Sequence, residues 1–298
     1  MTEFTAIDVS RLPAPAAVEV LDFEVILADM VATLTNPDVF PQFSAITESD
    51  PAYKVLIVCA YREMVLRQRI NDATRQNMLA FATGSNLDHL AANLLITRKV
   101  LVPADPETNT PAVMESDAEL RRRVQLAPES YTTAGSAGSY VFHALGAHPD
   151  ILDASVDSPE PGEVVVTILS RVGDGVPSTA ARDAVVARLS GDTVRPLTDL
   201  VTVNNVTVVD YAIEAEIYTF EGPDSALVIA AAQANAEATR DALKRIARDI
   251  PLSAIYAALH VEGVSRVVLI TPASSITIGP GEVGHCTVIE LIHGGIDA

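Results

Sequence analysis

The sequence has no tryptophan, only two cysteines and only three lysines, and these scarcities exclude several classes of protein. Cys59 and Cys286 lie far apart and fit no metal-binding or redox spacing, so we expect two buried thiols in a reducing compartment. The strongest apolar run, residues 55–60, is far shorter than the roughly 20 residues that span a bilayer. Residues 1–4 have neither the basic start nor the apolar core of a secretory signal, and we expect none.

Positive charge is scarce as well. The 298 residues include 20 lysines and arginines against 39 aspartates and glutamates, which gives a formal net charge of −19. Such a surface repels the phosphates of nucleic acids and anionic lipids at long range, so we expect neither nucleic acid nor membrane as a partner. Most of the basic residues are arginines, which favour protein interfaces. A genome-wide preference for arginine explains the same excess, and both readings stay open.

The N-terminal third has the pattern of helices. Apolar residues recur at helical spacing over 17–34, and Asn36-Pro37 ends that segment. Asp50 and Pro51 provide a cap and a first position for a second helix that extends toward residue 82. We expect Gly84 to end that helix and Ser85 to cap a third.

Residues 75–98, "RQNMLAFATGSNLDHLAANLLITR", therefore predict a helical hairpin, which is also the outline of a DNA-binding helix-turn-helix. Residues 85–95 contain no arginine or lysine, and Asp88 would be repelled by phosphate. Leu87, Leu90 and Leu94 instead form an apolar stripe. The hairpin is thus predicted to pack against protein and not to read DNA.

The rest of the chain alternates between helices and strands. A Pro-rich link at 102–111 precedes a helix with a capping box at Ser116 and Glu119. Small residues at 132–138 predict either a hinge or an ordinary loop. The further elements predicted are helices at 140–145, 177–189 and 225–250, and strands at 151–157, 163–169 and 206–219, the last half-buried and antiparallel.

An internal similarity suggests two related modules. "ILDASVDSP" (151–159) aligns without gaps on "VSRVVLITP" (264–272), and each is followed by a Gly-Glu-Val strand. Chance similarity of β-rich segments is the alternative. We predict an α+β protein with a helical N-terminal unit over 1–113, then two small α/β modules in series over 114–205 and 206–298, from a possible internal duplication.

No motif predicts catalysis or a cofactor. Residues 279–284 fit a dinucleotide-binding glycine pattern, but a strand follows where that site requires a helix, so we expect a hairpin loop. The six histidines have no zinc-binding or nucleophile spacing. We therefore assign no catalytic, cofactor-binding or metal residues.

Five stretches in order resemble the baseplate J-like proteins of contractile-tailed phages and related injection particles. They are "ATGSNLDHLAANLLITR" (82–98), "ESDAELRRRVQLAPESYTTAGSAGSYVFHAL" (115–145), "SPEPGEVVVTILSRVGDGVPS" (158–178), "VRPLTDLVTV" (194–203) and "RDIPLSAIYAALHVEGVSRV" (248–267). Pro128 departs from the pattern by interrupting an expected helix.

This resemblance implies a structural, non-enzymatic role in the tail baseplate of a virion assembled in the host cytoplasm. The implied partners are a second copy within a wedge, an I-type wedge protein, and other hub and sheath-proximal tail proteins. Six wedges would close into a ring that couples baseplate rearrangement to sheath contraction. A non-catalytic adaptor of another assembly is the alternative, and an enzyme with an unrecognised acid/base site is a third. Residues that would serve in helix bundling between chains are Arg62, Arg67, Arg69, Arg75, Leu87, Leu90 and Leu94, although a solvated helix face is the better account of each arginine taken singly.

Overall fold

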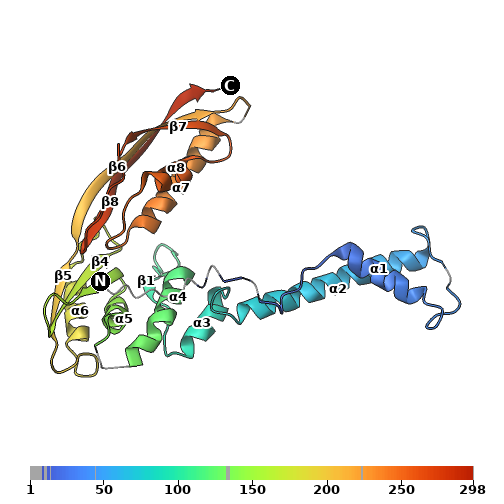
Figure 1. Cartoon of the computed structure of the whole chain (residues 1–298), viewed down its shortest axis with the longest axis horizontal. Coiled ribbons are helices and arrows are strands. Elements are labelled where there is room, and N and C mark those ends of the chain that lie inside the picture. The colour runs from blue at the N-terminus through green and yellow to red at the C-terminus, as the bar shows by residue number, and fades with distance from the viewer. Residues whose placement is uncertain are drawn as a thin grey trace. The chain divides into compact units, whose positions relative to one another are not determined.

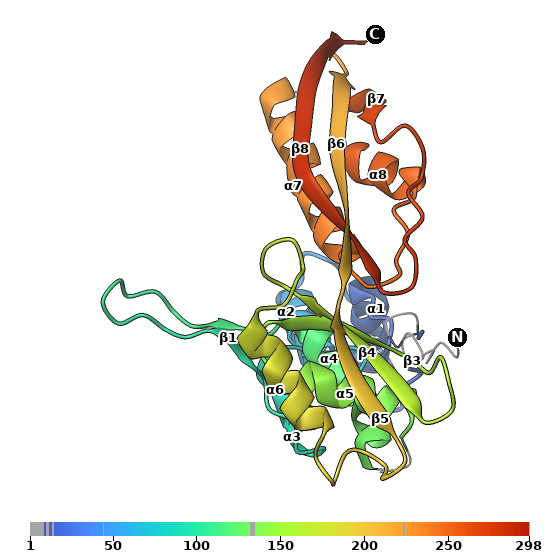
Figure 2. The same cartoon turned by 90° about the vertical axis from the view of Figure 1, so that its left-hand side faces the viewer.

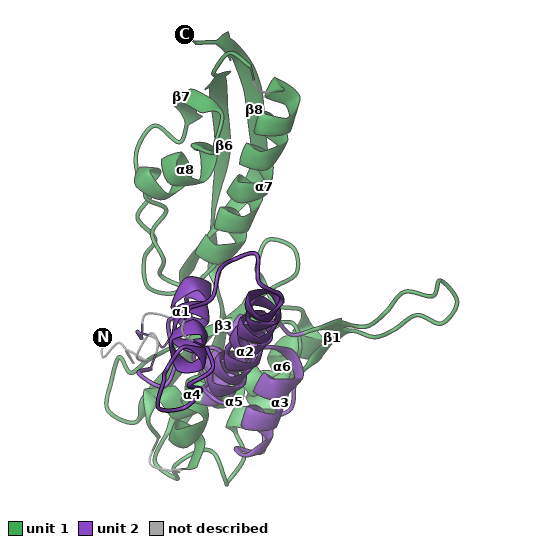
Figure 3. Cartoon of the chain, turned by 90° about the vertical axis from the view of Figure 1, so that its right-hand side faces the viewer, with its two compact units in different colours: residues 1–4, 99–114, 125–298 green, residues 5–98, 115–124 purple. Residues whose placement is uncertain are grey.

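The structure is a computed structural model that describes residues 9, 12–13, 15–43, 45–131, 135–222 and 224–297. It divides into two compact units (Figure 3). Unit 2 comprises residues 5–98 and 115–124, and unit 1 comprises residues 1–4, 99–114 and 125–298. The helical N-terminal region followed by sheet-containing modules confirms the predicted α+β class.

Unit 2 is helical, with α1 (Phe23–Leu34), α2 (Pro51–Gln76), α3 (Gly84–Ala92) and most of α4 (Asp117–Leu126). The prediction that the first helix begins at residue 17 was wrong, because the Asp22 side chain accepts hydrogen bonds from the amides of Glu24 and Val25 and begins the helix there. Buried Asn71 on α2 binds both backbone groups of Glu19, at 2.9 Å each. That amide therefore fastens the segment before α1 to α2.

The junction between α2 and α3 differs from the prediction. α2 ends at Gln76, and Gly84 begins α3 with Thr83 as its N-cap, so Gly84 does not end the preceding helix and Ser85 is not the cap. The Gln76 side chain accepts hydrogen bonds from the Thr83 amide at 3.0 Å and from the Asn86 side chain at 3.1 Å. These bonds hold the segment between the two helices in a turn. Asp50 makes no side-chain cap bond either, because its carboxylate accepts from Thr47.

Unit 1 begins with a projecting two-stranded arm, β1 (Val100–Val102) and β2 (Val113–Met114), whose hairpin is visible in Figure 2. Lys99 at its base donates to the carbonyls of Leu145 and His148 at the end of α5 (Ala137–Ala147). The cation therefore lies at the negative end of that helix.

The first module of unit 1 is a three-stranded sheet of order β3-β4-β5, made of β3 (Ile151–Asp157), β4 (Glu163–Ser170) and β5 (Leu200–Asn205). Strand β4 pairs antiparallel with β3 and parallel with β5. Helices α5 and α6 (Thr179–Leu189) enclose a core around Tyr140, Ile168 and Leu189.

The sequence did not predict strand β5 of this module. A short 3-10 helix, Ala127–Tyr131, follows α4 where Pro128 interrupts the helix. Ser136 caps α5, and residues 132–134 of the predicted hinge or loop lie outside the described residues.

The second module has a sheet of order β7-β6-β8, with β6 (Thr207–Thr219), β7 (Val264–Thr271) and β8 (Glu282–Ile296). β6 is antiparallel to β7 but parallel to β8, so the prediction of an antiparallel strand was only half right. The predicted helix 225–250 ends early, because the chain turns after Leu243 at the end of α7 (Ser225–Leu243). A separate helix, α8 (Leu252–Leu259), begins beyond the predicted range. Figure 1 shows both helices on the same side of this sheet.

The predicted internal duplication gives similar but not equivalent modules. Each sheet has one antiparallel and one parallel pair around its central strand. However, β4 is the central strand of the first sheet, whereas β8, its counterpart in the sequence alignment, is an edge strand. Residues 279–284 are not a hairpin loop, because β8 pairs with β6 and residue 276 forms only an isolated bridge with Ile250.

A defined joint connects the two modules within unit 1. Leu169, Val206 and Val283 form a small buried cluster across it. Lys244 donates to the carbonyls of Gly173 at 2.9 Å and Arg171 at 3.3 Å, and its burial lowers the pKa of its amine. The Ile246 amide donates to the Asp153 carboxylate at 3.2 Å. The modules are therefore held by polar bonds as well as by an apolar cluster.

Candidate assembly surfaces

The outward face of α2 is an exposed apolar surface of unit 2. One side of α2 packs on α1, where Ala60 is fully buried with Ile26 and Leu27. At 100° per residue, the opposite side carries six apolar side chains that are 44–62 % exposed. These are Val55, Val58, Tyr61, Val65, Leu66 and Ile70. We call this surface the α2 face, and it is unusually apolar for a helix exposed to water.

Two of the four predicted interface arginines lie within this α2 face. Arg62 and Arg69 are exposed and, at helical spacing, stand among its apolar side chains. Arg67 lies toward the other side, where it pairs with Glu63 at 2.5 Å and Glu19 at 3.6 Å. Arg75 is half-buried in the last turn of the helix. The structure thus brings Arg62 and Arg69 together and separates them from Arg67 and Arg75.

The predicted leucine stripe of α3 faces largely inward. Leu87 is fully buried in the core of unit 2, and Leu90 and Leu94 are half-buried. Leu87 is thus not exposed for contact with another chain, whereas the outer edges of Leu90 and Leu94 are. From the sequence alone, an interface with another chain and packing within unit 2 predict the same spacing of leucines along the helix. The pattern therefore could not decide between them.

The hairpin is locked by arginines that the sequence analysis did not single out. Arg98 donates to Asp88 and Asp117, both at 2.7 Å, and to the Glu115 carbonyl. Arg121 caps the carbonyls of Leu79 and Ala82 at 2.7 Å each. Burial opposes the charged form of Asp117, but the Gly84 amide and Arg98 outweigh it and lower the pKa of that carboxyl. These arginines bind carboxylates and carbonyls of unit 2 itself, and so they hold the turn in position.

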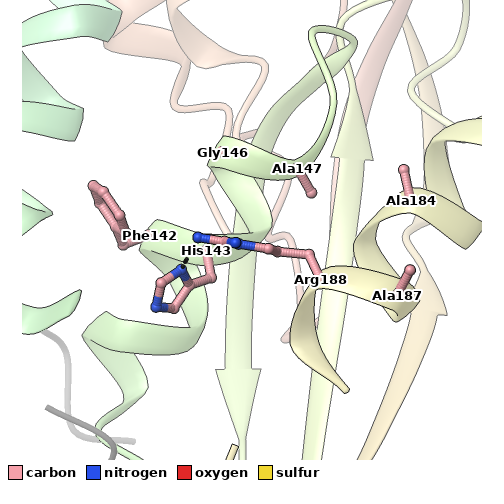
Figure 4. A pocket seen from close by; sticks show the side chains of 7 residues that line it. All are labelled: Phe142, His143, Gly146, Ala147, Ala184, Ala187 and Arg188. Atoms are coloured by element: carbon pink, nitrogen blue, oxygen red, sulfur yellow. Dashed lines mark hydrogen bonds between the residues drawn. The ribbon is translucent and has the colours of Figure 1, made fainter. Parts of the chain in front are cut away.

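A hollow of about 460 Å³ lies between α5 and α6 in the first module (Figure 4). Its lining is small and partly apolar, with Gly146, Ala147, Ala184 and Ala187 around Phe142. Buried His143 accepts at Nδ1 from Arg188 at 3.3 Å, since a guanidinium has no acceptor. Burial, with the nearby Arg188 charge, lowers the pKa of His143 to about 4. The imidazole is therefore neutral at pH 7 and acts as a structural acceptor.

The described residues show no arrangement that would hold a metal: they contain no cluster of three or more histidine, cysteine, aspartate or glutamate side chains suited to one. The prediction that both cysteines are buried was wrong for Cys59, which is exposed on α2, and right for Cys286. No helix in the described part of the chain is long and apolar enough to cross a membrane.

Comparisons with known proteins match all three regions of the chain. Residues 48–105 match the baseplate J-like N-terminal domain, residues 132–205 the baseplate J-like central domain, and residues 211–292 the baseplate J-like protein C-terminal domain. The chain is 45 % identical over 298 residues to Baseplate protein J of Escherichia phage P2, covering 98 % of this chain and 99 % of that protein. It also resembles a chain of the cryo-EM baseplate of the anti-feeding prophage, at 17 % identity and a TM-score of 0.39. That alignment covers 60 % of this chain and 44 % of the other. A score that low adds no further inference.

Proposed function

We propose that this chain, which belongs to the baseplate J-like protein family, is a wedge component of a contractile-tail baseplate. Identity of 45 % over nearly the whole of both chains makes it a structural protein of a phage-type baseplate, located in the tail of a virion. Its family is one of structural proteins, and we propose no catalytic role for it.

The finer proposal is that the chain pairs with a second copy in each wedge and joins an I-type wedge protein. Six wedges then close into a ring that couples baseplate rearrangement to contraction of the sheath. Domain boundaries at 1–113, 114–205 and 206–298 belong to the same proposal, as does contact between chains through Arg62 and Arg69. The hub and sheath-proximal proteins of the tail are the further partners.

The observation that best supports an assembling protein is the α2 face. Exposing six large apolar side chains on one helix costs free energy in water, at about 25 cal/mol for each Å2 of apolar surface that another protein would cover. The two arginines within it suit a protein partner that presents carboxylates, with which their guanidinium forks pair. A chain built to act alone has no use for such a surface.

Deletion and complementation test this function. We expect that deleting the gene leaves particles without a complete baseplate, and that the wild-type chain restores them. Electron microscopy of the purified particles distinguishes the outcomes. Normal baseplates without this chain would contradict the proposal, because a wedge component cannot be dispensable for the wedge.

A further inference from the structure

The second module leaves one face of its sheet open. On β6, Tyr211, Ile213, Ala215 and Ile217 are buried on the side of α7 and α8. Alternation along the strand turns Glu214 and Glu216 to the other side. Figures 1 and 2 show α7 and α8 on one side of the sheet only. Among the described residues of this module, no helix covers the side that bears these glutamates.

Acidic residues run down the middle of this open face. Glu214 of β6 is the register partner of Glu290 on β8, and Glu216 is the partner of Ile292 on β8 and Val268 on β7. Register partners point to the same face of a sheet, so these side chains stand together. The apolar flanks are 36–49 % exposed and comprise Val268, Ile270, Val288 and Ile292.

The two adjacent carboxylates have no positive partner. Among the described residues, neither Glu214 nor Glu290 takes part in a hydrogen bond or ion pair. Glu216 accepts only from the Tyr218 hydroxyl, at 3.0 Å. The nearby Arg266 is already engaged, since it lies 4.0 Å from the Tyr218 ring and pairs with Asp297 at 2.9 Å. An apolar face with unpaired negative charge at its centre favours an apolar partner that carries positive charge.

The α2 face has the complementary pattern. Arg62 and Arg69 stand within its apolar side chains, and neither has an ion pair or hydrogen bond among the described residues. Seven residues of helix separate them by about 10 Å along the axis. Glu214 and Glu216, two residues apart on β6, are separated by about 7 Å, which flexible arginine side chains span.

We propose that the open sheet face of one copy receives the α2 face of a second copy, with Arg62 and Arg69 paired to Glu214, Glu216 and Glu290. Like charges disfavour pairing either face with itself, because two arginines would meet two arginines, or glutamates would meet glutamates. The contact is therefore heterologous, and a chain that uses both faces joins two neighbours, which produces a closed ring or an open filament. This inference rests on the proposed baseplate role and names a contact within it.

Charge reversals in the full-length chain test the contact. One variant, Glu214→Arg/Glu290→Arg, alters the sheet face, and another, Arg62→Glu/Arg69→Glu, alters the α2 face. Asp183→Arg/Asp192→Arg, at exposed positions of the first module, is the control with the same change of charge as the sheet variant. Sedimentation equilibrium at low salt measures the mass of each protein, and circular dichroism verifies its fold.

We expect the wild type and the control to self-associate as concentration rises, and each altered face to weaken association by about 30-fold or more. The two variants mixed together should associate again, because the intact α2 face of one meets the intact sheet face of the other and the two reversed faces are also complementary. Combining all four substitutions in one chain restores association.

A wild type that stays monomeric at all concentrations would overturn the inference, as would altered faces that associate like the wild type. Mixed variants that fail to associate with each other would also overturn it. Incorporation of the same variants into baseplates is scored separately. A chain that enters baseplates normally with only one of the two faces reversed refutes this contact and leaves the proposed function standing.

Discussion

Arg123 on α4 donates to the carboxylate of Glu115 at 2.6 Å, and both side chains are largely buried, at 11 % and 2 % exposed. The pair connects the last turn of α4 to the segment that precedes the helix, and Arg123 also donates to the Thr97 carbonyl at 3.2 Å. A buried ion pair is expensive to break, because the charge that remains has lost its partner without regaining water.

Glu115→Ala should therefore destabilise unit 2 by about 3 kcal/mol. The free energy of unfolding, measured by urea titration with a probe in unit 2, tests this value. Glu63→Gln removes the exposed partner of Arg67 in the same unit and should cost less than about 1 kcal/mol. Equal losses in the two variants would show that the Glu115 pair has no special weight.

The free energy of unfolding should fall as the pH is lowered from about 6.5 to about 4, because of His143. Its pKa of about 4 in the folded protein lies below the ordinary value of 6.5, so between these values the unfolded chain binds the proton and the folded chain does not. That contribution is complete above pH 6.5 and is lost as pH falls toward 4, about 3 kcal/mol in all. His143→Gln should flatten the dependence over this window.

Measuring the unfolding free energy at intervals from pH 7 to pH 4 tests the histidine. A Gln variant with the same slope as the wild type would assign the pH dependence to other groups. The His143 pKa itself, followed by NMR, should rise in Arg188→Gln, because the neighbouring charge opposes protonation.

Gly175→Ala should weaken the joint between the modules more than Gly173→Ala does. Gly175 has φ +109°, and a Cβ there would lie 2.6 Å from Leu169, a member of the joint cluster. Gly173 has φ +62° and open space around it. We expect a loss of about 2–3 kcal/mol for Gly175→Ala and about 1 kcal/mol for Gly173→Ala, measured by calorimetry. Equal losses would indicate that backbone strain, not the close contact, limits this turn.

Val58→Asp/Leu66→Asp should leave the isolated chain folded but block its assembly. Both side chains are about 60 % exposed, so neither contributes much to the core of unit 2. Burying a carboxylate in an interface without a partner is unfavourable, and association should fall by at least about 100-fold. Leu197→Asp/Leu227→Asp, at positions of unit 1 that are 96 % and 70 % exposed, is the control. Reduced thermal stability in the first variant would mean that these residues belong to the fold instead.

The sequence predicted well those elements whose signals are local. Strands β3, β4 and β7 and helix α6 appear close to where the pattern of apolar residues placed them. It failed where distant groups decide, as at Gln76, whose side chain binds Thr83 and ends α2 early. Strand β5 was missed because its burial alternates only weakly and its pairing with β4 is set by the intervening α6. Helical periodicity likewise could not distinguish the buried Leu87 from the exposed Leu66. The period shows that a helix has an apolar face but not which element packs on that face.

The most direct test of the baseplate role is to co-express the tagged chain with the other tail proteins encoded beside it. The gently purified material is then examined by mass spectrometry and negative-stain microscopy. We predict that the I-type protein co-purifies in a fixed ratio and that wedge-shaped or six-fold ring particles appear. A chain that elutes alone as a monomer, while those neighbours are present and folded, would contradict the wedge proposal.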